Sequence, residues 1–155
     1  MGRILATGRS RASKCILLAE DNPADSYLIR ESLQKHNKNN ILELIVVTDG
    51  EQAIDYVLRR GKFVQACRPD LIVLDLNLPK SDGVEVLRCV REQADLHDVP
   101  VVVLTSSNSA RDRSIAERLG ANRFITKPLD LDEYMALGGT LLNYLEGSSA
   151  AGVTA

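Results

Sequence analysis

Apolar residues recur along the chain in two patterns. Short runs rich in Val, Ile and Leu predict strands at 16–19, 41–47, 71–74, 99–104 and 123–126. Three of these runs are almost unbroken, which is typical of strands buried on both faces of a parallel sheet. Longer segments with helical character follow each run and predict helices at 24–36, 51–60, 84–93, 110–119 and 131–146. Strand then helix, five times over, predicts an α/β fold with a five-stranded doubly wound parallel sheet and five helices.

The two ends of the chain differ from this repeating part. Residues 1–13 carry basic side chains and no acid, and residues 148–155 are small and uncharged. Neither end offers enough apolar surface to order itself. We therefore expect a flexible N-terminal arm over 1–13, one compact domain over 14–147 and a disordered tail over 148–155.

The charge and the cysteines narrow the class of protein. The 155 residues include 19 Lys or Arg and 21 Asp or Glu, a formal net charge of −2. This balance gives no basic field for nucleic acid or an anionic membrane, so neither is an expected partner. The apolar runs are far shorter than the ~20 residues that cross a bilayer, and no secretory signal is evident. Three cysteines without a Cys-x-x-Cys pair predict a reduced, cytoplasmic protein with no disulfide scaffold, in which Cys15 is part of the core.

Residues capable of chemistry follow four of the predicted strands. Glu20 and Asp21 follow the first strand, Asp75 the third, Thr105 the fourth and Lys127 the fifth. In a doubly wound sheet the carboxyl ends of the strands form the binding edge, so we expect these side chains to converge. Clustered carboxylates repel one another unless a cation lies between them, and a set of oxygen ligands favours Mg²⁺.

The same cluster suits phosphoryl chemistry. Carboxylates can form acyl phosphates, which makes Asp75 the candidate nucleophile. Lys127 would place positive charge near one phosphoryl oxygen, and Thr105 would donate a hydrogen bond to another. A single acid at a strand end is often only a helix cap, but four strand ends with compatible groups favour a phosphoryl site.

Four motifs, in this order, resemble the receiver domain of bacterial two-component response regulators over about residues 14–147. They are Ile-Leu-Leu-Ala-Glu-Asp-Asn-Pro at 16–23, Leu-Ile-Val-Leu-Asp-Leu-Asn-Leu-Pro at 71–79 with Asp82-Gly83 after it, Val-Val-Val-Leu-Thr-Ser-Ser at 101–107 and Phe-Ile-Thr-Lys-Pro at 124–128. The resemblance implies a flavodoxin-like fold of receiver type, Mg²⁺ as cofactor and a sensor histidine kinase as partner. It also implies a signalling phosphoacceptor, whose only catalysis is self-phosphorylation and autodephosphorylation.

The resemblance assigns the phosphoacceptor and the switch. It makes Asp75 the phosphoacceptor and Lys127 the residue that contacts the phosphoryl group. Thr105 and Phe124 resemble the switch pair: the Thr105 hydroxyl would move inward on phosphorylation, and Phe124 would rotate into the vacated space. The face made by the fourth helix, fifth strand and fifth helix would change with them. Phe124 stands where many members have Tyr, and the Lys127–Pro128 bond is expected to be cis, as in the family.

The resemblance also assigns the metal ligands and the residues that set the lifetime of the phosphorylated state. Asp21, Asp75 and the main-chain carbonyl of Asn77 would bind Mg²⁺, and Glu20 would support the ion through water. Glu20 stands where many members have Asp. The side chains of Asn77 and Ser107 would tune dephosphorylation, because they can orient or block the attacking water.

A narrower resemblance points to the small stand-alone regulators of cyanobacterial phytochrome histidine kinases. It rests on Glu-Asp-Asn-Pro-Ala-Asp at 20–25, on Arg-Pro-Asp-Leu-Ile-Val-Leu-Asp-Leu-Asn-Leu-Pro at 68–79, and on the long stretch 61–70. It implies a phytochrome kinase as partner and a place in a light-signalling phosphorelay.

Three alternatives were weighed against the receiver interpretation. A haloacid-dehalogenase-type phosphatase needs a second Asp two residues after the nucleophile as general acid, and Asn77 at that position cannot transfer a proton in this way. A nucleotide-binding protein would need more of a phosphate loop than Gly61-Lys62. A receiver that works without phosphorylation would not be expected to keep all the residues of the cluster.

The last predicted helix carries two apolar stripes. Leu131, Met135, Leu142 and Leu145 form one stripe, suited to packing on the sheet. A second flank carries four further apolar residues, which could be a wide core contact but rather favour an isologous homodimer, because exposed apolar clusters usually mark interfaces. The residues of this flank are Tyr134, Leu137, Leu141 and Tyr144.

Overall fold

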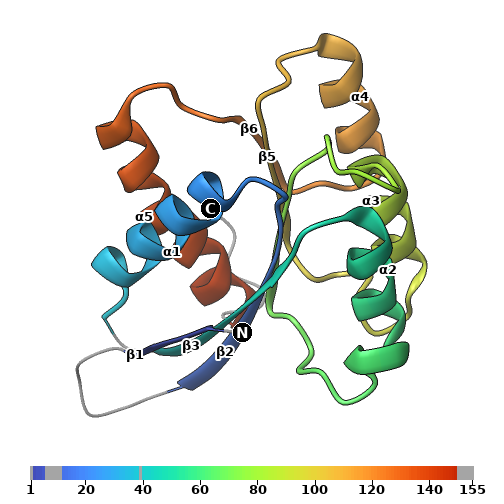
Figure 1. Ribbon diagram of the computed structural model, residues 1–155, viewed down its shortest axis with the longest axis horizontal. Helices are drawn as coiled ribbons and strands as arrows, with labels where there is room; N and C mark the ends of the chain where they lie inside the picture. The colour runs from blue at the N-terminus through green and yellow to red at the C-terminus, as the bar shows by residue number, and fades with distance from the viewer. Residues whose placement is uncertain (1, 6–11, 39, 150–155) are drawn as a thin grey trace.

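The structure, a computed structural model, describes residues 2–5, 12–38 and 40–149. Its centre is a six-stranded sheet with the strand order β1-β3-β2-β4-β5-β6 (Figure 1). The strands are β1 (Gly2–Leu5), β2 (Ala12–Ala19), β3 (Asn40–Val47), β4 (Leu71–Leu74), β5 (Val101–Thr105) and β6 (Arg123–Thr126). The pairs from β2 to β6 are all parallel, which confirms the predicted five-stranded parallel sheet.

Helices cover both faces of this sheet (Figure 1). α1 (Pro23–His36) and α5 (Leu131–Ser149) lie on one face, and the other face carries α2 (Gly50–Leu58), α3 (Gly83–Glu92) and α4 (Ala110–Arg118). A short 3₁₀ helix, η1 (Gly61–Phe63), follows α2. Alternate residues of each strand point to opposite faces, so β2 contributes Leu17 to one hydrophobic core and Ile16 to the other. The central strands β4 and β5 are buried at every position, as their unbroken aliphatic runs predicted.

The N-terminal arm was expected to be flexible, and this expectation is wrong for the residues that the structure describes there. Gly2–Leu5 forms β1, which pairs antiparallel with β3, with Gly2 opposite Leu44 and Leu5 opposite Ile41. The first parallel strand, β2, begins at Ala12 rather than at Ile16. The physical reason is that the exposed edge of β3 offers unpaired main-chain groups, and even a four-residue segment can satisfy them.

The C-terminal boundary also differs from the prediction. α5 continues to Ser149, so residues 148 and 149 of the predicted tail are helical. Residues 150–155 of that tail, like residues 6–11 of the arm, lie outside the described part of the chain.

Cys15 and Cys67 are joined as a disulfide, which corrects the expectation that the cysteines stay separate. Their Cα atoms are 6.6 Å apart although the two residues are separated by 52 positions in the sequence. Two hydrogen bonds to Asp70 explain this proximity: the Cys15 amide donates to the side-chain oxygen Asp70 Oδ2 at 2.9 Å, and the Asp70 amide donates to the Cys15 carbonyl at 2.7 Å. These bonds draw the stretch before β4 against the start of β2.

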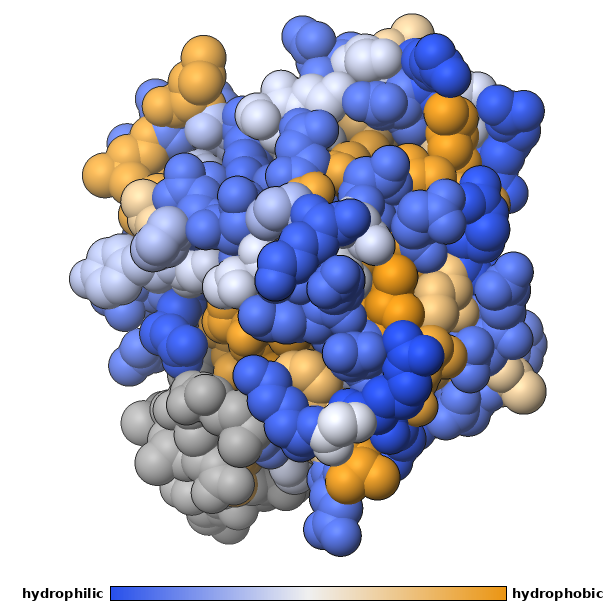
Figure 2. Space-filling model, turned by 45° about the vertical axis from the view of Figure 1, so that its right-hand side comes forward, coloured by the Kyte–Doolittle hydropathy of each residue, from blue (hydrophilic) through white to orange (hydrophobic). Residues whose placement is uncertain are grey.

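The second apolar flank of α5 is not an exposed face, and the prediction that it forms a dimer surface is wrong in this respect. Tyr134, Leu137 and Leu141 are only 4%, 7% and 1% exposed, and Tyr144 is half-buried. The apolar arc is wide because α5 packs on α1 as well as on the sheet. Figure 2 shows another side of the molecule, where hydrophobic side chains lie in small groups on a mostly hydrophilic surface.

Two further observations complete the fold. The Lys127–Pro128 bond is trans, since the described residues contain no cis peptide bond, and the expected cis bond is therefore corrected. The trans isomer is the lower in energy for an X–Pro bond by about 0.5–1 kcal/mol. None of the helices in the described ranges is both long and apolar enough to cross a membrane.

Candidate functional site

The predicted site residues meet at the carboxyl ends of the parallel strands. Glu20 and Asp21 directly follow β2, Asp75 follows β4, Thr105 ends β5 and Lys127 directly follows β6. Carboxylate oxygens of Glu20, Asp21 and Asp75 all lie within 4.8 Å of one another. We call these three carboxylates together with the Lys127 ammonium the acidic mouth. Parallel strands bring their ends to one edge of the sheet, which is why residues distant in the sequence converge here.

Lys127 is the centre of charge in the acidic mouth. Its Nζ donates to Glu20 Oε1 at 2.8 Å, to Asp25 Oδ2 at 2.9 Å and to Asp75 Oδ2 at 3.0 Å. Burial alone would lower the pKa of Lys127, but the hydrogen bonds to Glu20, Asp25 and Asp75 outweigh it and raise that pKa above its usual range. The ammonium is therefore charged at all physiological pH values.

Glu20 and Asp21 differ in their exposure to solvent although they are neighbours in the sequence. Glu20 is buried, and desolvation raises its pKa from the ordinary 4.5, while hydrogen bonds from Lys127 and from the Asn22 amide partly offset this rise. Asp21 is exposed. One carboxylate thus faces the protein interior and the other faces solvent, so the acidic mouth can take up an ion from water and hold it against a buried oxygen.

Asp75 is buried and held on both oxygens. Its Oδ2 accepts from Lys127, and its Oδ1 accepts from the Asn77 amide at 3.0 Å. Gly83, at the start of α3, packs against the main chain of Asp75 so closely that a Cβ at this position would overlap the Asp75 carbonyl oxygen. The Asp82-Gly83 pair of the sequence motif therefore supports the loop that presents Asp75.

Thr105 lies at the end of β5 and is fully buried. Its Oγ1 accepts from Asn77 Nδ2 and from the Ser107 amide, both at 3.3 Å. Both bonds use the oxygen as acceptor, so the hydroxyl proton is available to donate. Ser107 is itself held by Asp112, to which its hydroxyl donates at 2.6 Å.

Phe124 is the second residue of the expected switch pair. The residue is only 9% exposed and belongs to the core beneath α2, α3 and α4. The Arg113 guanidinium of α4 lies over its ring, 4.6 Å from the ring centroid. The ring is therefore packed between the core and a cation of α4.

Asp25 and the Tyr134 hydroxyl are part of the site but were not identified from the sequence. Asp25 Oδ1 accepts from the Tyr134 hydroxyl at 2.9 Å, while its Oδ2 accepts from Lys127. In the sequence, an acid in the first turn of a helix predicts a favourable interaction with the helix dipole, and a tyrosine in an apolar stripe predicts a core contact. Neither pattern indicates a functional site. The signal in the sequence is that Asp25 is four residues after Asp21 and follows Pro23, which places it in the first turn of α1.

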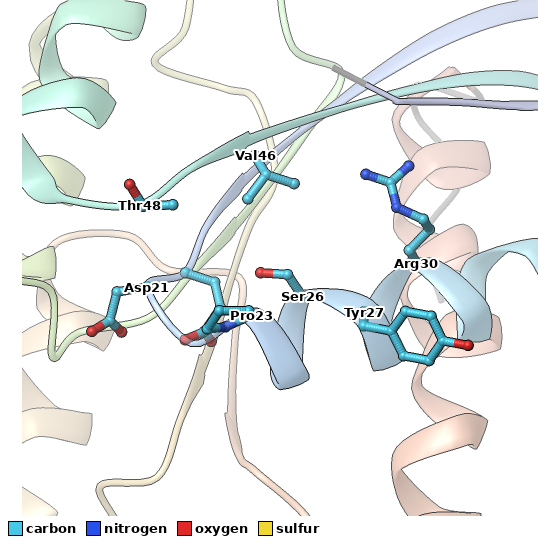
Figure 3. Close-up of a pocket in the computed structure, with 8 residues that line it drawn as sticks. Asp21, Pro23, Ser26, Tyr27, Arg30, Val46 and Thr48 are labelled. Atoms are coloured by element: carbon cyan, nitrogen blue, oxygen red, sulfur yellow. The ribbon is translucent and has the colours of Figure 1, made fainter.

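A cavity of about 350 Å³ opens beside the acidic mouth, between α1 and the end of β3 (Figure 3). Asp21 and Thr48 line its end near the carboxylates, whereas Tyr27 and Arg30 of α1 line the other end. Solvent and small ligands can therefore reach Asp21 from this side.

The chemistry of the donor set fits a divalent metal. Three carboxylates in contact carry more negative charge than one ammonium can balance, and hard oxygen ligands are those that such cations prefer. The residues that would hold the ion are Glu20, Asp21, Asp75 and the main-chain carbonyl of Asn77, which is in the loop after Asp75.

Comparison with known proteins gives consistent matches. Residues 16–137 match the family model described as the response regulator receiver domain. The chain is 41% identical over 124 residues to the response regulator Rcp1 of Synechocystis sp. (strain ATCC 27184 / PCC 6803 / Kazusa), covering 80% of this chain and 83% of that protein. Other curated relatives named MprA are longer: the chain spans about half of them, for example 54% of that from Mycobacterium leprae.

Two solved structures are similar over most of the chain. The phosphorylated cyanobacterial phytochrome response regulator RcpA is 39% identical with a TM-score of 0.82, covering 88% of this chain and 96% of that one. The Mn²⁺-bound form of Rcp1 is 37% identical with a TM-score of 0.78, covering 91% and 97%.

These matches place the protein among signalling proteins rather than among enzymes that turn over a substrate. Receiver domains of this kind are phosphorylated on an aspartate by histidine kinases, and their structures bind a divalent metal in an acidic site. The five parallel strands and the three carboxylates at one edge of the sheet agree with these matches. The chain belongs to the response regulator receiver domain family, and it is a response regulator similar to Rcp1 and RcpA.

Proposed function

We propose that this response regulator accepts a phosphoryl group on Asp75 from the phosphohistidine of a sensor histidine kinase. The observation that carries the proposal is the position of Asp75, whose carboxylate accepts from the Lys127 ammonium and lies within 4.8 Å of the other two carboxylates of the acidic mouth. A carboxylate oxygen attacks phosphorus, the phosphorus–nitrogen bond breaks, and its electron pair stays on the imidazole nitrogen, which takes up a proton. Lys127 and the Thr105 hydroxyl then stabilise the phosphoryl oxygens.

The proposed cofactor is Mg²⁺, held by Asp21, Asp75 and the Asn77 main-chain carbonyl, with Glu20 in support. When bound, the ion offsets negative charge on the phosphoryl oxygens. Support comes from the all-oxygen donor set and from the Mn²⁺ bound to Rcp1, because the two cations share oxygen ligands.

Binding of Mg²⁺ is expected to weaken as the pH falls. The loss of affinity is expected to begin at a higher pH than it would if Glu20 had the pKa of an ordinary glutamate. Burial raises the pKa of Glu20 above 4.5, so its carboxylate takes up a proton early and is lost to the metal. Isothermal titration at several pH values measures this. Glu20→Gln is the matched control, because it is expected to bind more weakly and with a smaller pH dependence. An affinity that does not change with pH in the wild type would contradict the proposed ligands.

The proposed output is a change of the face made by α4, β6 and α5. The Thr105 hydroxyl would donate to a phosphoryl group on Asp75, and an inward movement of its oxygen would lengthen the hydrogen bond that it accepts from Asn77 Nδ2. Phe124 would then rotate into the space that Thr105 vacates, and its contact with the Arg113 guanidinium would change with it. Asn77 and Ser107 are the proposed residues that tune dephosphorylation.

The proposed partner is a phytochrome-type histidine kinase in a light-signalling phosphorelay. The support is the similarity to RcpA, a cyanobacterial phytochrome response regulator, and to Rcp1. A cytoplasmic location is part of the proposal, because a histidine kinase needs cytoplasmic ATP. A homodimer is also part of it, with contacts other than the buried flank of α5, and light-scattering mass with and without phosphorylation tests it.

Phosphotransfer tests the proposed function directly. A phytochrome kinase and an unrelated histidine kinase, each labelled on its histidine, are mixed separately with the protein. We expect rapid transfer from the first and transfer at least about tenfold slower from the second. The phosphatase alternative predicts steady hydrolysis of a generic phosphate ester. Under the proposed function this hydrolysis is negligible. Absence of transfer from both kinases would refute the proposal.

A further inference from the structure

Asp25 connects the acidic mouth to α5. It lies in the first turn of α1, and its two oxygens have different partners: Oδ2 accepts from Lys127 at 2.9 Å, and Oδ1 accepts from the Tyr134 hydroxyl at 2.9 Å. Tyr134 lies in the first turn of α5, where its amide donates to the Asp130 carbonyl. The Asp25 carboxylate therefore connects Lys127, which contacts Asp75, to the first turn of α5, a helix of the output face.

The hydrogen bonds of Lys127 are fully used before phosphorylation. An ammonium has three protons, and Glu20, Asp25 and Asp75 accept all three. A phosphoryl group on Asp75 brings new acceptor oxygens that carry more charge. Lys127 can donate to one of them only if it gives up one of its present partners.

Asp25 is the partner that can be released most easily. Its side chain is 18% exposed, whereas those of Glu20 and Asp75 are 1% and 5% exposed. A carboxylate that reaches solvent regains hydration when its bond breaks, while a buried one is left without a partner. The new bond from Lys127 to the phosphoryl group therefore replaces the bond to Asp25.

Release of Asp25 changes the environment of Tyr134. Burial and the hydrogen bond to Asp25 both raise the pKa of this phenol, so its hydroxyl keeps its proton and acts as a donor. Tyr134 is only 4% exposed, and its ring is fixed in the core between α5, α1 and the sheet. When Asp25 no longer accepts from Lys127, its hydrogen bond from the Tyr134 hydroxyl changes in strength and geometry. The Tyr134 ring then moves with its hydroxyl and displaces the first turn of α5.

We propose that Asp25 is a positioning residue that holds the Lys127 ammonium beside Asp75 before phosphorylation and transmits its release to α5 through the Tyr134 hydroxyl. This inference rests on the proposed function, because it requires Asp75 to be the phosphoacceptor. It adds a route from the site to the output face that does not pass through Thr105 and Phe124.

Tyrosine NMR tests the inference by a signal that a purely structural role would not move. The chain has four tyrosines, and labelling each at Cζ gives four resonances that report hydrogen bonding of the hydroxyl. The Tyr134→Phe variant identifies the resonance of Tyr134, and the exposed Tyr27 serves as an internal reference. Spectra are recorded before and after treatment with acetyl phosphate and Mg²⁺, with the phosphorylated fraction measured by intact mass.

In the wild type, the Tyr134 resonance is expected to shift on phosphorylation while that of Tyr27 stays. In Asp25→Asn, compared at equal phosphorylated fraction, at least two thirds of the shift is expected to be lost. The matched control Glu133→Gln, which neutralises an exposed acid of the first turn of α5, should keep the whole shift.

A second variant guards against a loss that comes from misfolding. Tyr134→Phe removes one hydroxyl and keeps the ring, and it should abolish the phosphorylation-dependent shifts of the main-chain amides of Asp132 and Glu133. The inference is overturned if Asp25→Asn keeps the full Tyr134 shift, or if the phosphorylated wild type shows none. A wild type that gains no phosphoryl mass overturns the proposed function, and the inference with it.

Discussion

Replacing Asp75 with asparagine is expected to abolish phosphorylation by acetyl phosphate or by a histidine kinase and to leave the fold intact. An amide oxygen is a far poorer nucleophile than a carboxylate oxygen, and loss of a nucleophile costs at least about a thousandfold in rate. Neighbouring acids are not expected to take over, because Glu20 is buried and bonded to Lys127, and Asp21 is exposed and has no bond to Lys127 among the described contacts. Intact mass after incubation with acetyl phosphate and Mg²⁺ measures the result.

The stability of the Asp75→Asn variant separates a chemical effect from a structural one. The single amide oxygen of Asn can still accept one of the two bonds that Asp75 accepts, from Lys127 or from the Asn77 amide, and one negative charge leaves a cluster of like charges. We expect the free energy of unfolding to stay the same or to rise by about 1 kcal/mol. Asp49→Asn is the matched control: it changes another buried aspartate, one that caps α2, and it should label like the wild type. Equal labelling of Asp75→Asn and wild type would place the phosphoacceptor elsewhere.

Gly138→Ala is expected to destabilise the protein by about 2–4 kcal/mol, the scale of overpacking against main chain that cannot move. Gly138 is where α5 crosses α1, and a Cβ there would overlap the Ser32 carbonyl oxygen. The same crossing is fixed by Ser32 Oγ, which accepts from the Gly138 amide at 2.6 Å and donates to the Met135 carbonyl at 2.7 Å. A methyl group would push the two helices apart and break both bonds.

The next residue provides an internal control for this effect. At Gly139 the nearest atom to an added Cβ is His36 Cδ2 at 3.4 Å, an ordinary contact. Gly139→Ala should therefore stabilise the protein by up to about 1 kcal/mol, because alanine favours the helix. Denaturant unfolding followed by circular dichroism compares the two variants. Similar changes in the free energy of unfolding would show that α1 and α5 do not meet closely at Gly138.

The elements that were predicted correctly depend on periodic patterns. An unbroken aliphatic run such as 71–74 is typical of a strand buried on both faces of a sheet. The alternation of strands and helices then restricts the number of possible topologies. The same topology predicted that Asp75 and Lys127 would meet, although they are 52 positions apart. Convergence of strand ends is a property of the fold, so it could be predicted without knowing any contact.

Features that depend on packing between particular side chains could not be predicted. The pairing of Cys15 with Cys67 follows from hydrogen bonds between Cys15 and Asp70, which the spacing of the cysteines does not reveal. The apolar flank of α5 has the same pattern whether α1 or a second chain covers it, so Leu137 and Leu141 were assigned to the wrong partner.

The direction of β1 has a practical consequence for experiments on this protein. Because β1 is antiparallel to β3, its first residue, Gly2, lies opposite Leu44, toward the end of β3 that leads to the acidic mouth. α5 begins beside Asp25 and ends at Ser149, about 28 Å away along its axis. A label attached near Gly2 would therefore lie along the edge strand of the sheet, whereas one attached at Ser149 would lie about one helix length from Asp25. Labels at the described end of α5 therefore leave Asp25 clear.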